Sequence, residues 1–261
     1  MKGGVNCCML YDKYLVTMIE GVVMKKKFIF FSLMLLTMLA TCTFLFINDY
    51  YHADEVAIAT LNSNETDHVL VSEKENMLIF LPKGGSETGI IFYPGGKVEY
   101  SAYAPLLYRC AEQGITCVLL QMPANLAFLN IGAAEGIAER YTHVDTWYLA
   151  GHSLGGAMAA SYLVNHADFY EGIILLASYS TEPLYGERVL SIYGSEDLVL
   201  NMEKYETNRA NFPDDVVERI VEGGCHAYFG AYGMQDGDGI PSITPEEQWV
   251  ITAQAITEFI K

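Results

Sequence analysis

The chain has 261 residues, of which 51% are hydrophobic and 12% aromatic, and its formal net charge is −17. This length and apolar content can fill the core of one sizeable domain, and they exclude an intrinsically disordered chain. The acidic excess is spread along the sequence without blocks, which argues for a soluble surface and against a nucleic-acid partner. The sequence contains no internal repeat and no sign of a second domain.

The first predicted element is an uncharged segment of twenty residues, from Phe28 to Ile47. At a rise of ~1.5 Å per residue, a helix of this length spans about 30 Å, the thickness of a bilayer core. Three lysines, Lys25 to Lys27, precede the segment, and acidic residues follow it. The positive-inside rule therefore predicts a single pass through the cell membrane, with the N-terminus in the cytoplasm and the domain outside.

Two alternatives to an uncleaved anchor stay open. The segment could be a cleaved signal peptide of a secreted protein, or a lipoprotein signal, since Leu39-Ala40-Thr41-Cys42 resembles a lipobox that would place a lipid on Cys42. Met24 directly precedes the lysines and has the context of an initiator. We therefore interpret residues 1–23 as an over-extended start and residues 24–47 as the anchor or signal segment.

The remaining chain is predicted to hold a tether, residues 48–65, and one domain, residues 66–261. Apolar runs and apolar residues at helical spacing predict its strands and helices. The strands are expected at 68–72, 76–81, 89–93, 115–121, 147–150, 171–177, 189–193 and 216–221. The helices are expected at 100–113, at 154–166, at 201–210, at 244–260 and, less strongly marked, within 125–140. This alternation predicts an α/β fold: a doubly wound, mostly parallel sheet with right-handed crossovers and an antiparallel start.

The chemistry is centred on Thr146 to Gly156, T-W-Y-L-A-G-H-S-L-G-G, where a strand runs into G-x-S-x-G and then into a helix. In that context the motif predicts a nucleophile elbow, because the turn strains the serine backbone and little but glycine fits two residues to either side. Ser153 is the predicted nucleophile. The backbone N–H of Leu154, at the start of the helix, is a predicted oxyanion donor.

A serine nucleophile needs a base, and the base needs a carboxylate that holds its tautomer. Asp197 is the predicted acid, because Tyr193-Gly194-Ser195-Glu196-Asp197 leaves a strand two crossovers after the elbow. Glu196 is its rival. His226 is the predicted base, since it follows the last strand in a loop expected to be flexible enough to swing over the serine. The other histidines precede the core, lie beside helix ends or, for His152, pack sideways inside the elbow.

The second oxyanion donor is expected in Pro94-Gly95-Gly96-Lys97, after the third strand. Gly96 and Lys97 are the candidate N–H groups, and the choice between them is open. The Lys97 side chain could also attract an anionic substrate.

The site is expected to be an open cleft without a cap domain, because the eleven residues 178–188 are too few for a helical lid. Apolar side chains from two loops are the predicted pocket walls. They are Met122, Leu126 and Phe128 on one side and Tyr228, Phe229 and Tyr232 on the other.

The domain contains three cysteines, Cys110, Cys117 and Cys225, so no disulfide framework is predicted. Cys225 precedes the candidate base, but no second Cys or His lies at ligand spacing, and we predict neither a metal nor a cofactor.

These motifs give the chain a family resemblance over about residues 66–261: it resembles the α/β-hydrolase superfamily. The segments P-G-G, G-H-S-L-G-G, Y-G-S-E-D and G-G-C-H-A-Y-F-G-A-Y-G-M-Q-D-G-D-G are similar to those of small, often membrane-anchored bacterial hydrolases of the dienelactone-hydrolase-like branch. The resemblance implies Ser153, Asp197 and His226 as a catalytic triad. It assigns no role to Asp236 or Asp238 and implies no physiological substrate.

The expected function is hydrolysis of a carboxylic ester, or of a similarly activated acyl group, through an acyl-enzyme. Acyl transfer or amide cleavage by the same triad is one alternative, and a catalytically silent surface binding module is the other. The expected partner is a small acyl substrate, and the sequence makes no prediction of the oligomeric state.

Overall fold

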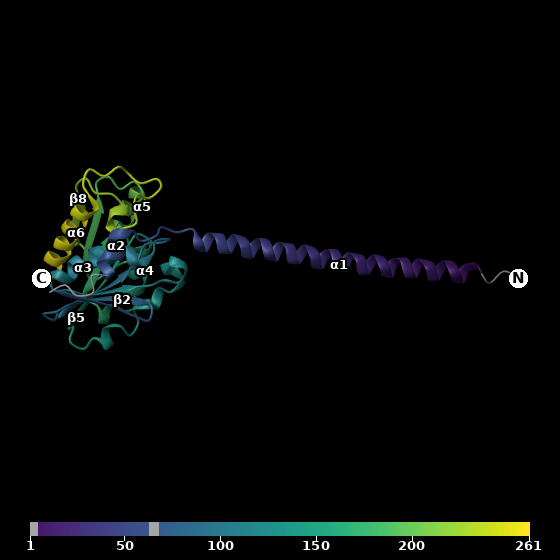
Figure 1. Ribbon diagram of the computed structural model, residues 1–261, viewed down its shortest axis with the longest axis horizontal. Helices are drawn as coiled ribbons and strands as arrows, with labels where there is room; N and C mark the ends of the chain where they lie inside the picture. The colour runs from purple at the N-terminus through teal and green to yellow at the C-terminus, as the bar shows by residue number, and fades with distance from the viewer. Residues whose placement is uncertain (1–4, 63–67) are drawn as a thin grey trace. The chain divides into compact units, whose positions relative to one another are not determined.

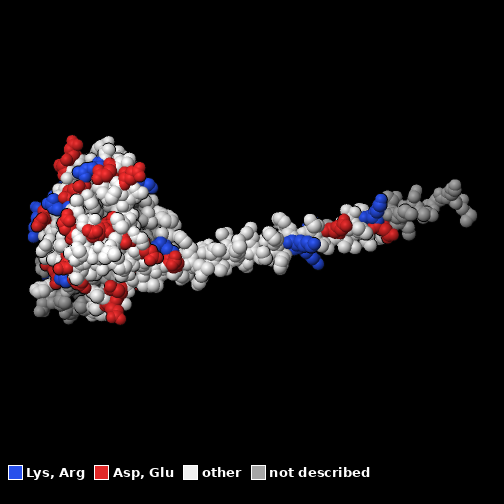
Figure 2. Space-filling view, turned by 90° about the horizontal axis from the view of Figure 1, so that it is seen from above, with Lys and Arg blue, Asp and Glu red and all other residues white. Residues whose placement is uncertain are grey.

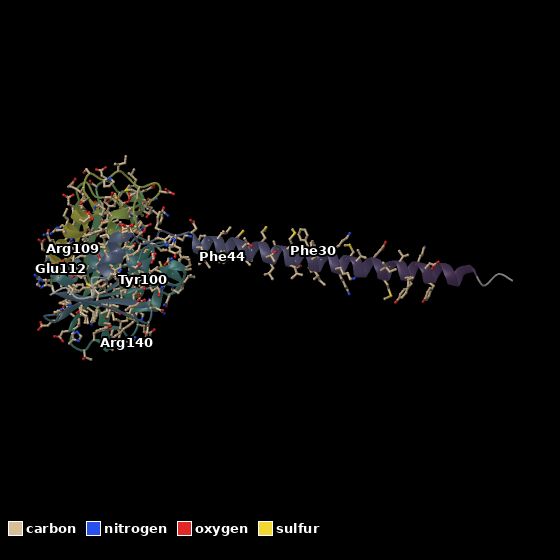
Figure 3. All side chains as sticks on the ribbon, in the orientation of Figure 1. Phe30, Phe44, Tyr100, Arg109, Glu112 and Arg140 are labelled. Atoms are coloured by element: carbon tan, nitrogen blue, oxygen red, sulfur yellow. The ribbon has the colours of Figure 1, made fainter. Side chains whose placement is uncertain are left out.

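A computed structural model describes residues 5–62 and 68–261, in two compact units, Met1–Asp49 and Tyr50–Lys261. The first unit is one helix, α1 (Val5–Asn48), which runs without a break across Met24. Within the described residues one helical stretch, Tyr11–Asn48, is long and apolar enough to cross a membrane. Its apolar side chains, such as Phe30 and Phe44, project outward from the helix (Figure 3).

The second unit is built on an eight-stranded sheet with the order β1-β2-β4-β3-β5-β6-β7-β8. β1 and β2 pair antiparallel, β2 pairs antiparallel with β4, and all other neighbours are parallel. The strands are β1 (Val69–Lys74), β2 (Met77–Pro82), β3 (Thr88–Tyr93), β4 (Thr116–Leu120), β5 (Thr146–His152), β6 (Gly172–Leu176), β7 (Arg188–Gly194) and β8 (Val217–Val221). The predicted α/β fold, with its mostly parallel sheet and antiparallel start, is confirmed.

Helices cover both faces of this sheet (Figure 1). Two apolar clusters result, and successive strand residues alternate between them: Ile90 and Phe92 pack on one face with α3 and α6, whereas Ile91 and Tyr93 pack on the other with α4. The helices are α2 (Glu55–Asn62), α3 (Ala104–Glu112), α4 (Leu154–Leu163), α5 (Met202–Asn208) and α6 (Pro245–Ile260). Both faces are buried, which explains why the central strands are continuous apolar runs.

The outer surface of the second unit is acidic. Figure 2 shows Asp and Glu side chains scattered over the visible face, with fewer Lys and Arg among them. The described ion pairs are mostly exposed, as between Arg109 and Glu112 on α3. Exposed pairs of this kind contribute little to stability, so the sheet and its two apolar layers hold the domain together.

The prediction of a helix within residues 125–140 is wrong. Four short 3-10 turns occupy this region: η2 (Pro123–Asn125), η3 (Ala127–Leu129), η4 (Ile131–Ala134) and η5 (Ala138–Arg140). Ala124, Asn125 and Gly136 have positive φ angles of 52°, 56° and 70°. An α-helix cannot continue through residues in the left-handed region, so the chain turns repeatedly instead.

Part of the segment interpreted as a tether packs against the domain. Tyr51 forms a bridge with Val98, its N–H donating to the Lys97 carbonyl and its carbonyl accepting from the Glu99 N–H. Asp54 then caps α2, whose Ala57 is fully buried. Residues 51–62 therefore belong to the folded unit; the rest of the expected tether, 63–67, lies outside the described residues.

No helix occurs between β6 and β7, where residues 177–187 are all described. The short connection predicted there is confirmed, and the fold carries no cap domain at this position.

Candidate active site

The G-x-S-x-G segment forms a sharp turn between β5 and α4. Ser153 has φ 52° and ψ −125°, a strained backbone conformation for a residue with a side chain. Three hydrogen bonds hold it there: its N–H donates to the Leu176 carbonyl at 2.9 Å, and its carbonyl accepts from the Ser178 hydroxyl at 2.7 Å and from the Ala157 N–H at 3.2 Å. The side chain is partly exposed. The strand, turn and helix predicted for the elbow are present.

The glycines on either side of Ser153 are required by sterics. A Cβ on Gly155 would overlap the carbonyl oxygens of Tyr93 and Pro94 at the end of β3, and one on Gly151 would lie 2.6 Å from the Gly156 nitrogen. Both positions therefore exclude any larger residue, as the turn geometry predicts.

Asp197 and His226 form a buried pair. His226 Nδ1 lies 2.9 Å from Asp197 Oδ2, and the two side chains are 2% and 1% exposed. Asp197 Oδ1 also accepts the N–H groups of Val199 and Leu200, at 3.0 and 2.8 Å. With Oδ1 occupied by two N–H donors, Oδ2 is the oxygen that faces His226. An ionised Asp197 makes Nδ1 the protonated nitrogen and leaves Nε2 of His226 able to accept a proton.

Glu196, the rival acid, points elsewhere. It is exposed, and its Oε1 accepts a hydrogen bond from the neighbouring Ser195 hydroxyl at 3.2 Å. The structure therefore brings Asp197, and not Glu196, to His226.

The elbow lies next to the His226 loop. The ring of His152, the residue before Ser153, has its centroid 4.5 Å from that of His226 and 5.5 Å from that of Phe229. His152 is 1% exposed, and burial, together with the adjacent His226, holds its pKa well below the usual range. His152 is therefore a neutral packing partner beside the candidate base.

Tyr103 joins the elbow to the loop after β3. Its hydroxyl accepts the Gly95 N–H at 3.0 Å and lies 2.8 Å from His152 Nδ1. Burial raises the pKa of Tyr103, so the hydroxyl keeps the proton that it can donate to His152. The sequence places Tyr103 on the apolar face of a helix and does not indicate this contact.

The prediction that left Lys97 as a possible oxyanion donor is corrected, because its N–H donates to the Asn125 carbonyl at 2.8 Å. The Gly95 N–H is used by Tyr103. Gly96 lies between them and packs on the elbow, since a Cβ there would meet Leu154 Cδ2 at 2.8 Å. Leu154 begins α4, and the first N–H groups of a helix lack acceptors within it. Gly96 and Leu154 are the remaining candidate donors.

The loop that carries His226 is held, not free to swing. Gln248, fully buried on α6, accepts the Cys225 N–H at 3.0 Å and donates to the Cys225 carbonyl at 2.8 Å. The side chain thus pairs with both polar groups of the residue before His226. Gln248 was missed at the sequence level, where a polar residue in an amphipathic helix gives no signal.

Two of the predicted pocket walls are corrected. Phe229 is 0% exposed and Tyr232 is 7% exposed, and both belong to the apolar cluster that α3 and α6 cover. They pack inward against His152 and Tyr51 respectively, which leaves almost no surface for a substrate. Tyr228 is partly buried against the same cluster.

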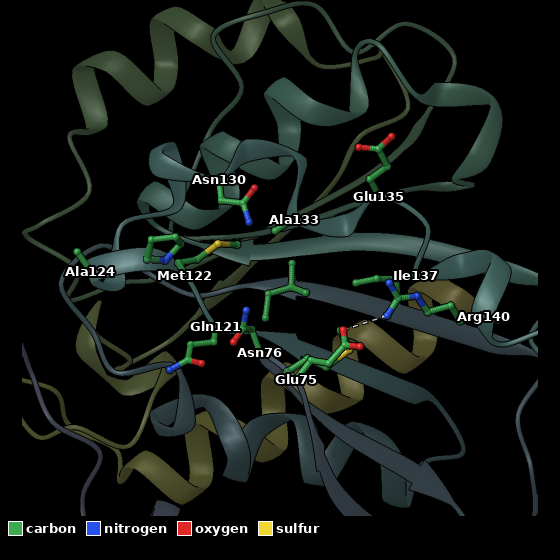
Figure 4. A pocket seen from close by; sticks show the side chains of 13 residues that line it. Glu75, Asn76, Gln121, Met122, Ala124, Asn130, Ala133, Glu135, Ile137 and Arg140 are labelled. Carbon is green, nitrogen blue, oxygen red and sulfur yellow. Dashed lines mark hydrogen bonds and ion pairs between the residues drawn. The ribbon is translucent and has the colours of Figure 1, made fainter.

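The three residues predicted to form the other wall of the pocket differ in exposure and position. Phe128 is 50% exposed and Leu126 is 6% exposed. Met122 lines a cavity of about 380 Å³ near the end of β4, together with Gln121, Asn130 and the Glu75–Arg140 ion pair (Figure 4). Ser153 and His226 do not line this cavity.

Cys110, Cys117 and Cys225 are all buried and unpaired. Burial raises the pKa of the Cys225 thiol to about 12. Among residues 5–62 and 68–261, no group of three His, Cys, Asp or Glu side chains is placed to hold a metal ion.

Comparison with known proteins gives one family match and several matches of fold. The model of the alpha/beta hydrolase family matches residues 89–250. No curated protein sequence matches the chain significantly. Among solved structures, a CIB-like hydrolase from Thermoplasma acidophilum is 18% identical, with a TM-score of 0.51 over 73% of this chain and 99% of its own.

Two further solved structures are similar. Est1E from Butyrivibrio proteoclasticus is 15% identical, with a TM-score of 0.52 over 74% of this chain and 99% of its own. The epoxide hydrolase VrEH1 from Vigna radiata is 11% identical, with a TM-score of 0.54 over 75% of this chain and 98% of its own. At these identities the likeness shows the fold alone.

Proposed function

The chain belongs to the alpha/beta hydrolase family, and from that premise we propose that it is a serine hydrolase that cleaves carboxylic esters. One observation carries the proposal: a buried His226–Asp197 pair lies next to an elbow whose strained residue is a serine. This arrangement has the parts that activate a hydroxyl nucleophile, namely a base, its orienting carboxylate and a serine at a helix start.

In the proposed reaction the Ser153 Oγ attacks the ester carbonyl while His226 Nε2 takes the proton of the Ser153 hydroxyl. The N–H groups of Leu154 and Gly96 stabilise the oxyanion, and the imidazolium is stabilised by Asp197. His226 then returns the proton to the departing alcohol, which leaves Ser153 acylated. A water molecule, deprotonated by His226, cleaves the acyl-enzyme and regenerates the hydroxyl.

Within the family we propose a place in the dienelactone-hydrolase-like branch, which rests on G-G-C-H-A-Y-F-G-A-Y-G-M-Q-D-G-D-G around His226. The likeness to Est1E, also solved with ferulic acid bound, is compatible with an ester substrate. The open connection between β6 and β7 favours water over a second acceptor, and therefore hydrolysis over acyl transfer.

We further propose that α1 anchors the enzyme in the cell membrane through residues 28–47, with Lys25 to Lys27 on the cytoplasmic side and the hydrolase domain outside. A cleaved signal sequence has the same composition, and lipid attachment at Cys42 is the other alternative. The size of the mature N-terminus, read by mass spectrometry of the purified protein, separates the three.

Labelling with a fluorophosphonate probe tests the proposed function, because only an activated serine reacts. We expect the wild type to be labelled and to hydrolyse p-nitrophenyl butyrate, and Ser153→Ala to do neither. Ser161→Ala is the matched control. This serine lies on α4 and its hydroxyl donates to Glu182 at 3.2 Å, so the variant should be labelled like the wild type. An unlabelled wild type would favour the silent binding module.

A further inference from the structure

Asp238 lies in Gly237-Asp238-Gly239, twelve residues after the proposed base, and the reaction above does not use it. Its carboxylate accepts three backbone N–H groups. Oδ2 accepts from Ala227 at 2.8 Å, and Oδ1 accepts from Gly239 at 2.8 Å and from Leu198 at 3.3 Å. Ala227 directly follows the proposed base, and Leu198 directly follows the proposed acid. One side chain thus connects the residues next to both members of the pair.

A second contact joins the same segments. Gly239 is buried, and a Cβ on it would overlap the carbonyl oxygen of Glu196, the residue before the acid. The backbone of residues 238–239 therefore packs directly on the turn that carries Asp197.

Without Asp238, few hydrogen bonds join the acid turn, which is residues 195–200 after β7, to the base turn, which is residues 222–229 after β8. The Ser195 and Glu196 N–H groups donate to the Val221 and Gly224 carbonyls at 3.0 and 2.8 Å, and the Gly223 N–H donates to the Ser195 hydroxyl at 2.8 Å. These bonds precede the functional residues in both turns. Asp238 ties the side that follows them, so His226 and Asp197 are each held on both sides.

We propose that Asp238 is a positioning residue: it holds the acid turn and the base turn at the separation that keeps His226 bonded to Asp197 and directed at Ser153. This inference rests on the proposed serine hydrolase function. A carboxylate suits the role because both of its oxygens accept, and the two turns each offer an N–H. A shift of about 1 Å in such a pair can lower a rate by about 10²-fold.

The variants follow from the acceptor count. Asp238→Ala removes all three bonds, whereas Asp238→Asn keeps one oxygen and can serve only one of the two turns. Asp236→Asn is the matched control, since Asp236 is exposed and its side chain makes no hydrogen bond within the described residues. The readouts are kcat and KM for p-nitrophenyl butyrate, the rate constant of fluorophosphonate labelling, and the thermal unfolding midpoint.

We expect Asp238→Ala to lower kcat and the labelling rate by about 10²-fold, with KM changed by less than about threefold. Asp238→Asn should show a smaller loss, and Asp236→Asn should match the wild type. If Asp238→Ala does not fold, Asp238→Asn decides. Asp238 variants that match Asp236→Asn overturn the inference. If they do so while the wild type is labelled at Ser153, the proposed function stands and only this inference fails; an unlabelled wild type removes both.

A double-mutant comparison separates positioning from general stabilisation. In an Asp197→Ala background the pair no longer exists, so Asp238→Ala should lower the labelling rate by less than about threefold. A loss as large as in the wild-type background would overturn the inference, because Asp238 would then act independently of the pair.

Discussion

Replacing Asp197 by asparagine tests the acid with almost no change of shape. In the structure Oδ1 accepts from Val199 and Leu200, and Oδ2 faces His226 Nδ1. An asparagine that keeps the two backbone bonds must place its amide NH₂ group against Nδ1. That nitrogen then has to accept, so the proton moves to Nε2, and the imidazole presents a donor where Ser153 needs a base.

We expect this substitution to lower kcat by about 10⁴-fold, which corresponds to about 5.5 kcal/mol of transition-state stabilisation. The assay is initial-rate hydrolysis of p-nitrophenyl butyrate, with the thermal unfolding midpoint measured alongside it to exclude misfolding. Glu196→Gln is the matched control, because Glu196 is exposed and its only described side-chain bond is to Ser195. A large loss in Glu196→Gln, with Asp197→Asn near wild type, would refute the reasoning.

Four other outcomes follow from the contacts. Gln248→Leu should lower the free energy of unfolding, measured in urea, by about 2–6 kcal/mol, because it leaves the buried N–H and carbonyl of Cys225 without partners at about 1–3 kcal/mol each. An unchanged stability would mean that water replaces the amide. A chain starting at residue 48 should be soluble and active, whereas one starting at residue 55 loses the Tyr51 bridge and should lose at least about tenfold in kcat; equal activities would contradict this. N-ethylmaleimide at pH 8 should leave activity intact, since the buried Cys225 thiol, with its pKa at about 12, stays protonated below that pH; rapid inactivation would indicate a reactive thiol. Because residues 177–187 contain no helix, the hydrolysis rate of a long-chain ester should show no sharp increase when the ester concentration passes its solubility limit. A sharp increase there would reveal a lid.

The sheet could be predicted from the sequence because its signal is local. Residues 89–93, G-I-I-F-Y, read as a buried strand, and β3 extends over Thr88–Tyr93 with alternate side chains in two apolar layers. The elbow was equally accessible, since its strand, turn and helix start are contiguous in sequence and Gly151 packs on Gly155 and Gly156 within that segment; only the contact of Gly155 with Tyr93 and Pro94 comes from another strand. Local pattern and tertiary structure agree at these positions.

Exposure could not be predicted in the same way, because it depends on distant partners. Phe229 follows the candidate base and looks like a pocket wall, yet it is fully buried in the apolar cluster that also contains side chains of α3 and α6. The prediction for residues 123–140 failed for a related reason: nothing in their sequence indicates that Ala124 and Asn125 take positive φ angles. Asn125 does so where its carbonyl accepts from Lys97, which couples this segment to the loop after β3.

The base loop shows most directly what tertiary contacts add to the chemistry. The sequence analysis expects a loop flexible enough to swing over the serine, but Gln248 from α6 pairs with Cys225, and Asp238 accepts from Ala227. The residues on both sides of His226 are therefore hydrogen-bonded. A base that had to swing into place would need to be ordered in every turnover. The proposed base, His226, is already bonded to Asp197 and buried beside the elbow, so in the proposed reaction that ordering takes place during folding, as in other preorganised sites. The physical requirement on the loop is therefore rigidity, with its glycines serving close backbone packing: Gly224 lies against Gln248, where a Cβ would meet Oε1 at 2.6 Å.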